Sequence, residues 1–180
     1  MSRLKRFSLQ FFPFRYGLTH ISTGDLLREE VKTGSEKGLY LQTIMESGEL
    51  VPSTEVFSFL KAFIEKAEPS AKGFLIDGYP RTSEQVAQFE QSVCPLSLVI
   101  YFHVSEKTMK NRVLKRGKRG VRIDDNETTA RKRIQVFNEH IDSIADHCKG
   151  KLVKIDAERL PGKIFVDVCV AISRIMEILS

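Results

Sequence analysis

The sequence has no long apolar run. Even the stretch Leu96–Val104 is interrupted by Ser97 and His103, whereas a helix needs about 20 predominantly apolar residues to cross a bilayer. We therefore exclude an integral membrane protein and expect no membrane partner.

Cysteine is also scarce. Cys94, Cys148 and Cys169 form no C-x-x-C pair and leave an odd number, which argues against a secreted disulfide framework and against a zinc site. The simplest interpretation is three small apolar side chains in a protein of a reducing compartment. We expect no metal site built by protein ligands alone.

The overall composition is that of a globular protein. The 180 residues are 42% apolar and 28% charged, which fits a single domain over residues 1–180 with a sizeable core. The net charge of +5 suits any polyanion, from nucleotide phosphates to RNA, and does not choose between them.

Acidic residues are missing from the first 24 positions, where Arg3, Lys5, Arg6 and Arg15 stand without a carboxylate. This pattern is typical of an organelle transit segment. The apolar alternation of Phe7–Phe11 is instead typical of a half-buried strand. The residues alone leave both interpretations open.

Periodicity and turn residues divide the rest of the chain into alternating strands and helices. This alternation predicts an α/β fold with an open parallel sheet flanked by helices. Strands are predicted at Gly73–Asp77, Leu96–Phe102 and Leu152–Ile155. A polar loop is predicted at 117–126. The predicted helices run from the Ser22–Asp25 cap through Val31, over Ser35–Met45, from Ser53 to before Pro69, over Ser83–Gln91, from Ser105 through Leu114, over Thr128–Asp146 and over Pro161–Leu179.

A turn with the sequence Asp77-Gly-Tyr-Pro-Arg81 follows the first of these predicted strands. Ligands of open α/β sheets bind outside the carboxyl ends of the strands. The turn therefore either projects Arg81 into a crevice or is an ordinary strand end with a solvated arginine.

Arginine is concentrated in the second half of the chain. Guanidinium groups bind phosphate oxygens in a bidentate geometry, although a solvated basic face or an RNA-binding surface has the same composition. The residues are Arg112, Arg116, Arg119, Arg122, Arg131 and Arg133.

Together these features resemble the nucleoside monophosphate kinases, and most of all the adenylate kinases of the short-lid, cytosolic type. The resemblance implies a P-loop kinase-like fold and transfer of the γ-phosphoryl group of ATP to AMP, giving two ADP. The motifs occur in the family's order from Tyr16 to the C-terminus: His20–Arg28, Gly48–Pro52, Gly73–Arg81 followed by Gln85, Leu114–Gly117, Arg122–Asn126 and Arg131–Arg133.

The resemblance implies an acceptor site for AMP in segment 22–52 and in the turn after Asp77. Arg81 would reach the AMP phosphate. Thr23 and Gln85 favour AMP, because the similar UMP/CMP kinases usually carry Ala and Asn at these two positions. The implied substrate-binding residues are Thr23, Arg28, Glu49, Leu50, Val51, Gly78, Tyr79, Pro80 and Gln85.

The donor site is implied in the same way. Arg112 would lie near the ATP base and Arg116 on the ATP phosphates, while Arg122 and Arg133 would hold the phosphoryl group in transit. Asp77 would lie near the Mg²⁺ ion that accompanies ATP. Residues 115–126 resemble a short lid, and the catalytic set is Arg81, Arg116, Arg122 and Arg133.

One element of that family does not occur in the sequence. The P-loop pattern G-x-x-x-x-G-K-[ST] cradles phosphates with its backbone and its Lys, and no stretch of the 180 residues matches it. A strand, this loop and a helix need about 23 residues, but only 15 precede Tyr16. We therefore expect the first strand and the P-loop to be missing or replaced.

The family places that first strand in the middle of its sheet, so its loss would leave the neighbouring strand edges unpaired. Residues 7–12 could fill the position as a strand. Alternatively, residues 1–15 could come from an alternative exon or an incomplete gene model joined to a kinase body. The sequence does not separate these possibilities.

Three functions follow from the sequence. The first is a monomeric, cytoplasmic adenylate kinase with ATP and AMP as its small-molecule partners, whose activity is in doubt without the P-loop. The second is a non-catalytic AMP-binding relative or a UMP/CMP kinase-like protein. An RNA-binding domain is the weakest, because the RNA-binding motifs of basic and aromatic residues are missing, and we expect no nucleic-acid partner.

Overall fold

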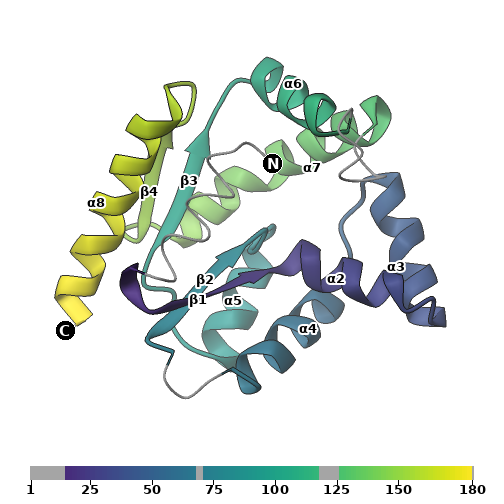
Figure 1. The fold of residues 1–180 in the computed structure, drawn as a ribbon, viewed down its shortest axis with the longest axis horizontal. Helices are drawn as coiled ribbons and strands as arrows, with labels where there is room; N and C mark the ends of the chain where they lie inside the picture. Colours follow the sequence, from purple (N-terminus) through teal and green to yellow (C-terminus); the bar gives the residue numbers. More distant parts are fainter. Residues whose placement is uncertain (1–14, 68–70, 118–125, 180) are drawn as a thin grey trace.

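The computed structural model describes residues 15–67, 71–117 and 126–179 as an α/β structure (Figure 1). Within these ranges no helix is both long and apolar enough to cross a membrane. The strands are β1 (Leu18–Ser22), β2 (Gly73–Asp77), β3 (Val99–His103) and β4 (Leu152–Asp156). The helices are α2 (Thr23–Lys32), α3 (Glu36–Ser47), α4 (Ser53–Glu65), α5 (Ser83–Ser92), α6 (Glu106–Gly117), α7 (Glu127–His147) and α8 (Pro161–Leu179).

The four strands form two parallel pairs. β1 pairs with β2 from Leu18 opposite Gly73 to Ser22 opposite Asp77, and β3 pairs with β4 in a register that ends with His103 opposite Asp156. The predicted α/β class and parallel pairing are confirmed. The prediction of one sheet is not, because the described strands form two separate two-stranded sheets, β1-β2 and β3-β4.

In the described part of the backbone, no hydrogen-bonded ladder joins the two strand pairs. Apolar side chains pack between them instead. One core is centred on α8 and β4 through Ile155, Ile164 and Val168. Leu75 of the first pair and Ile100 of the second both pack against this core. The relative placement of the two pairs therefore depends on side-chain contacts, which are less directional than hydrogen bonds.

A second core packs β1 against α2, α3, α4 and α5. It explains the helical spacing of apolar residues in this part of the sequence. Its buried members are Ile21, Leu27, Leu41, Val51, Val56, Phe57, Leu60, Tyr79 and Phe89.

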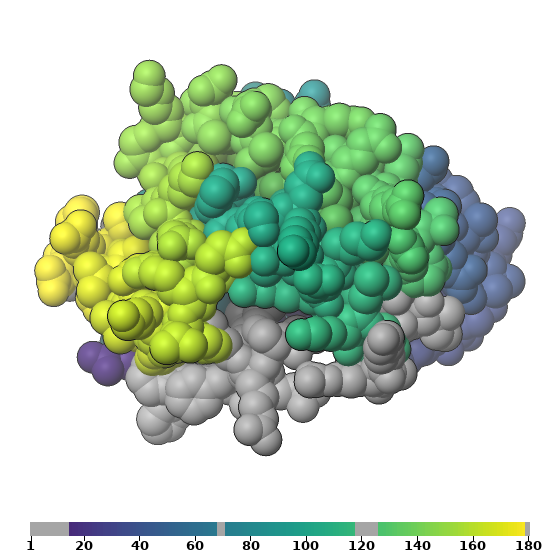
Figure 2. All heavy atoms as spheres, turned by 90° about the horizontal axis from the view of Figure 1, so that it is seen from above, coloured from purple at the N-terminus to yellow at the C-terminus, as the bar shows by residue number. Residues whose placement is uncertain are grey.

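Seen from above, α6, α7 and α8 form one face of the molecule, with α3 at its edge (Figure 2). α7 reaches both halves of the molecule, since it contacts α5 and α3 of the first half and α6 of the second. This long helix is the second connection between the two strand pairs.

Most helix ends follow the predicted signals. The Ser35 hydroxyl accepts a hydrogen bond from the Gly38 backbone N–H and begins α3, as expected for an N-cap. α3 ends at Gly48, whose φ of 79° suits glycine. By contrast, the interpretation of residues 7–11 as a strand lies outside the described residues.

β1 is the element that the sequence analysis missed. Leu18–Ser22 is short and contains Thr19 and His20, so it carries little of the apolar pattern of a buried strand. It is a strand because β2 lies beside it and accepts the pairing over all five residues.

The contact between α2 and α3 gives a prediction for stability. A Cβ on Gly38 would lie 2.6 Å from the backbone oxygen of Glu30 and 3.2 Å from the Cα of Val31. We expect Gly38→Ala to lower the free energy of unfolding by about 1–2 kcal/mol, because overpacking costs about 1–3 kcal/mol and the better helix propensity of Ala returns less than ~1. Chemical denaturation measures it.

Gly162→Ala is the matched control, since Gly162 lies in the first turn of α8 and, among the described residues, no other part of the chain lies within 4 Å of an added Cβ. It should be neutral or slightly stabilising. An equal loss in both variants would contradict the proposed close contact of α3 with α2.

Candidate functional site

The carboxyl ends of β1 and β2 lie side by side and begin the first half of the site. Thr23 follows β1 directly, is 3% exposed, and donates its hydroxyl proton to the backbone oxygen of Asp77 at 3.2 Å. Gly78 then turns the chain at a φ of 83°, and a Cβ there would lie 3.0 Å from the Thr23 hydroxyl oxygen. The two loops can approach this closely because residue 78 is glycine.

The turn after Asp77 is held by its own polar groups. Its Tyr79–Pro80 peptide bond is cis. The Tyr79 hydroxyl donates to the backbone oxygen of Gln85 at 2.6 Å, and burial raises the pKa of Tyr79 to about 12. The Arg81 Nε donates to the backbone oxygen of Gly78 at 2.9 Å. These hydrogen bonds fix the conformation of the turn from which the Arg81 side chain extends.

Gln85 contributes to the structure of this turn. Its side chain is 2% exposed. The Oε1 atom accepts a hydrogen bond from the Arg81 backbone N–H at 2.8 Å, and the Nε2 donates to the Ser53 hydroxyl at 3.3 Å. Gln85 thus ties the arginine turn to the start of α4, and sequence reasoning, which assigned it to base selection, missed this role.

The other predicted acceptor residues differ in exposure. The Arg28 guanidinium forms an ion pair with Asp25. In the segment before α4, Glu49 is exposed and Leu50 is half-buried, whereas Val51 is 7% exposed and belongs to the core. Within this segment, Glu49 and Leu50 are thus more accessible to a ligand than Val51.

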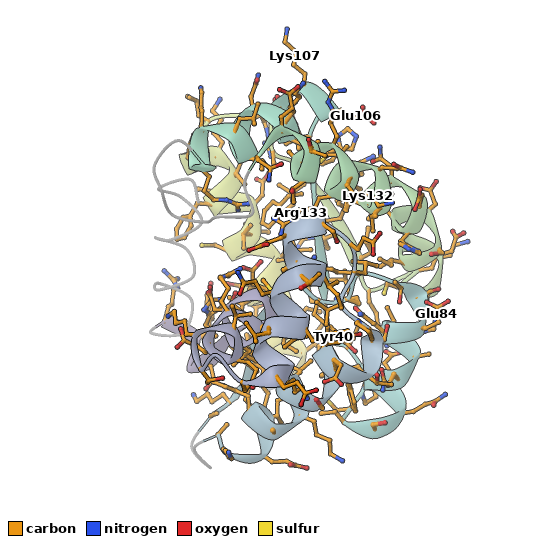
Figure 3. The ribbon with its side chains drawn as sticks, turned by 90° about the vertical axis from the view of Figure 1, so that its right-hand side faces the viewer. Tyr40, Glu84, Glu106, Lys107, Lys132 and Arg133 are labelled. Atoms are coloured by element: carbon orange, nitrogen blue, oxygen red, sulfur yellow. The ribbon has the colours of Figure 1, made fainter. Side chains whose placement is uncertain are left out.

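The start of α7 is docked on the end of α3. The Thr129 hydroxyl donates to the backbone oxygen of Glu46 at 2.8 Å, and the Arg133 Nη2 donates to that of Met45 at 3.4 Å. Figure 3 shows Arg133 at this junction. A cation is favourable here because the last carbonyl groups of a helix carry partial negative charge. The contact places Arg133 beside the end of segment 22–52.

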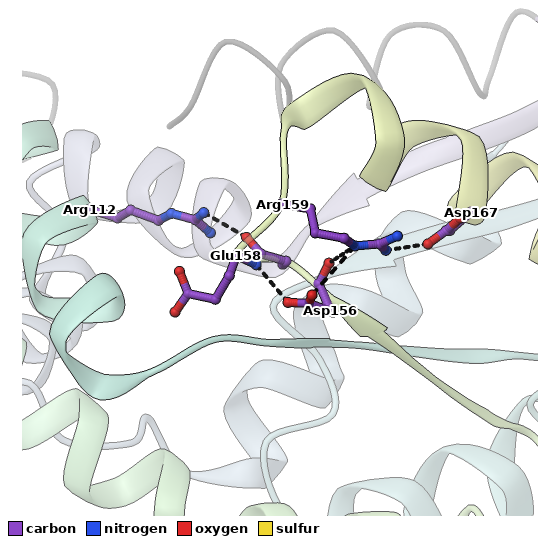
Figure 4. Close-up of polar contacts among 6 residues, drawn as sticks. Arg112, Asp156, Glu158, Arg159 and Asp167 are labelled. Atoms are coloured by element: carbon purple, nitrogen blue, oxygen red, sulfur yellow. Dashed lines mark hydrogen bonds and ion pairs between the residues drawn. The ribbon is translucent and has the colours of Figure 1, made fainter.

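The second half of the site is at the carboxyl ends of β3 and β4. α6 follows β3, and its Arg112 donates from Nη2 to the backbone oxygen of Ala157, which directly follows β4, at 2.8 Å (Figure 4). Arg116 lies one helical turn later and is half-buried. Arg122 and positions 118–125 of the predicted lid lie outside the described residues.

Arg131 differs from Arg133, although both are on α7. It is 70% exposed at its side chain and pairs with Glu127 at 2.9 Å. It lines a hollow of about 640 Å³ between α6 and α7, together with Glu106 and Lys110. Lys110 and Arg131 lower the pKa of Glu127 to about 2. Arg131 is thus on a different side of α7 from the contact with α3.

The chain resembles known proteins over most of its length. The adenylate kinase family model matches residues 9–153. Adenylate kinase isoenzyme 1 of Gallus gallus is 45% identical over 158 residues, which are 86% of this chain and 81% of that protein. Adenylate kinase 1 of Drosophila melanogaster is 44% identical over 165 residues (91% and 72%). Adenylate kinase isoenzyme 1 of Caenorhabditis elegans is 47% identical over 154 residues (84% and 73%).

The environment of Tyr79 gives a pH prediction. Its folded-state pKa of about 12 exceeds the unfolded value of 10.0, so its contribution to stability is complete below pH 10 and is lost as pH rises toward 12. Between pH 9 and 11 the unmodified protein should lose on the order of 1 kcal/mol of unfolding free energy that Tyr79→Phe does not lose. Urea unfolding of both proteins at the two pH values measures this, and equal losses would contradict it.

Proposed function

The chain belongs to the adenylate kinase family, which makes it a nucleoside monophosphate kinase and a phosphotransferase, and we propose that it transfers the γ-phosphoryl group of ATP reversibly to AMP. The products are two molecules of ADP. The observation that carries this proposal is the cluster of Thr23, Gly78, Arg81 and Gln85 at the carboxyl ends of β1 and β2, where ligands of α/β sheets bind.

AMP is the acceptor in this proposal. Arg81 binds the AMP phosphate. Its side chain extends from a turn whose conformation is fixed by a hydrogen bond to Gln85. Thr23 and Leu50 lie on the two ends of segment 22–52, which contacts the nucleoside. A charged fork on a well-ordered turn suits a phosphate, because little conformational freedom is lost on binding.

The donor is ATP, bound near Arg112 and Arg116 of α6. Transfer needs little protein acid or base, because positioning and charge neutralisation supply most of the catalysis of phosphoryl transfer. Arg81, Arg116, Arg122 and Arg133 are the groups we assign to that neutralisation. For Arg133 the assignment is supported by the docking of α7 on α3, which brings this side chain to the end of α3.

Mg²⁺ enters with ATP as part of the substrate. Among the described residues no group of three His, Cys, Asp or Glu side chains could hold a metal ion. Mg²⁺ in kinases is typically held by one or two carboxylates and the substrate phosphates. Asp77, at the end of β2, fits the single-carboxylate role and needs no further protein ligand.

A second candidate is AMP binding without efficient catalysis. It is favoured by one observation, since the 180 residues contain no P-loop pattern. The P-loop would supply several backbone N–H groups and a lysine to the β and γ phosphates. The acceptor residues do not depend on that loop, so AMP binding should persist when transfer is slow. The cytoplasmic, monomeric state expected for the protein remains part of the proposal.

The acceptor site is tested by nucleotide titration. We expect AMP to bind more tightly than UMP and CMP in calorimetry. We also expect Arg81→Ala to lower the affinity for AMP at least ~10-fold, because a charge-assisted hydrogen bond to the phosphate is lost. Arg131→Ala is the matched control, since Arg131 is exposed and pairs with Glu127, and it should leave AMP affinity unchanged. Equal affinity for the three monophosphates would remove the assignment to AMP.

Catalysis is tested by steady-state ADP formation. Individual phosphate-stabilising donors are worth about 10²–10³ in rate, so we expect turnover at least ~10³-fold below that of a chimaera in which a complete strand, P-loop and helix replace residues 1–15. Rescue in the chimaera would identify the missing loop as the defect. Near-normal turnover by the unmodified chain would show that these 180 residues suffice for transfer.

A further inference from the structure

Glu158 ties the loop after β4 to the start of α6. Its Oε1 accepts hydrogen bonds from the backbone N–H and the hydroxyl of Ser105, at 2.8 and 2.7 Å. Its Oε2 accepts one from the Thr108 hydroxyl at 2.8 Å. These hydrogen bonds hold the pKa of Glu158 at about 2, so the carboxylate is ionised at any physiological pH.

This carboxylate lies where a helix favours an anion. The first N–H groups of a helix have no partner within the helix, and its N-terminus carries partial positive charge. Ser105 already accepts from the Thr108 backbone N–H at 3.3 Å. Glu158, which is distant in sequence, adds three hydrogen bonds at the same helix end.

A second contact holds α6 one turn further along. Arg112 donates to the backbone oxygen of Ala157, the residue next to Glu158. Ala157 is 3% exposed, and its N–H donates to the backbone oxygen of His103 at 2.9 Å. Residues 157 and 158 therefore hold two successive turns of α6 against the ends of β3 and β4.

Hydrogen bonds and an ion pair also hold the loop after β4 in place (Figure 4). The Glu158 backbone N–H donates to the Asp156 carboxylate at 2.9 Å. Arg159 donates to the backbone oxygen of Asp156 at 3.0 Å and forms an ion pair with Asp167 of α8. The side chain of Glu158 thus extends from a loop that α8 holds in place.

These polar contacts carry unusual weight because α6 has no fully buried residue. Apolar packing usually sets the position of a helix in a globular protein. Besides the contacts of α6 with α7, the hydrogen bonds of Ser105, Thr108 and Arg112 to residues 157 and 158 hold this helix in position. We infer that Glu158 is a positioning residue for the donor nucleotide, since it orients the helix whose Arg112 and Arg116 are proposed to contact ATP.

The inference rests on the proposed function and is tested by separate titrations of ATP with Mg²⁺ and of AMP. We expect Glu158→Ala to raise the ATP dissociation constant at least ~10-fold, because small misplacements of binding groups cost that much, and to leave AMP binding within about twofold. Glu158→Gln should recover most of the loss, because its amide accepts from Ser105 and donates to the Thr108 hydroxyl.

Glu90→Ala is the matched control. Glu90 also joins separate parts of the chain, since its carboxylate accepts from the Leu96 backbone N–H at 3.1 Å and from Lys151 at 2.7 Å, and both of these partners lie outside α6. Its loss should lower stability without changing the ratio of ATP to AMP affinity.

In an Arg112→Ala background, Glu158→Ala should reduce ATP affinity less than it does in the unmodified protein, as expected for residues that act together.

The outcomes separate the inference from the proposed function. If the unmodified protein binds ATP and Glu158→Ala binds it equally well, the inference is wrong and the donor site stands. A parallel loss of ATP and AMP affinity would show a general structural role and also overturn it. If the unmodified protein binds AMP but no ATP at millimolar concentration, the donor site itself is wrong, and the role of Glu158 with it.

Discussion

Parallel backbone pairing within β1-β2 and β3-β4 positions the side chains that we propose to bind the nucleotides. Each pair ends in register, with Ser22 beside Asp77 and His103 beside Asp156. The loops that follow the strands therefore begin at common edges. Thr23 can bond to the Asp77 backbone and Arg112 to the Ala157 backbone only because of this register. A shift of one residue would also reverse the faces of the strands and expose their apolar side chains.

The division into two strand pairs matches the division of the proposed reaction. The residues proposed to bind the acceptor follow the first pair, and those proposed to bind the donor follow the second. Between them the described residues provide apolar packing around α8 and the contacts of α7. Because transfer requires the two nucleotides to be aligned closely, the alignment of the proposed acceptor and donor residues depends, within the described part of the chain, on this packing.

Polar side chains fix the turn and the helix starts that strand pairing does not position. Gln85 fixes the turn that carries Arg81, Thr129 fixes the start of α7, and Glu158 fixes the start of α6. Thr129 and Glu158 bond to partners that are distant along the chain, and Gln85 bonds both to the nearby Arg81 backbone N–H and to the distant Ser53, so local sequence patterns do not reveal these roles. The predicted roles of all the acceptor and donor residues in binding nucleotides, those of Arg81 and Arg112 included, stay predictions.

The sequence by itself determined the α/β class, the strand at Gly73–Asp77, the last strand to within one residue of its end (predicted as Leu152–Ile155, observed as Leu152–Asp156), and the approximate limits of helices such as α3 and α8. These are local properties, because caps, glycines and apolar periodicity act within a few residues. Only the tertiary structure decided that Leu18–Ser22 is a strand, that the described strands form two pairs, and that Gln85 and Glu158 hold other elements in place. The reason is that backbone pairing and buried polar bonds need a partner, and a short polar strand or a single glutamate does not specify which partner the fold will bring to it.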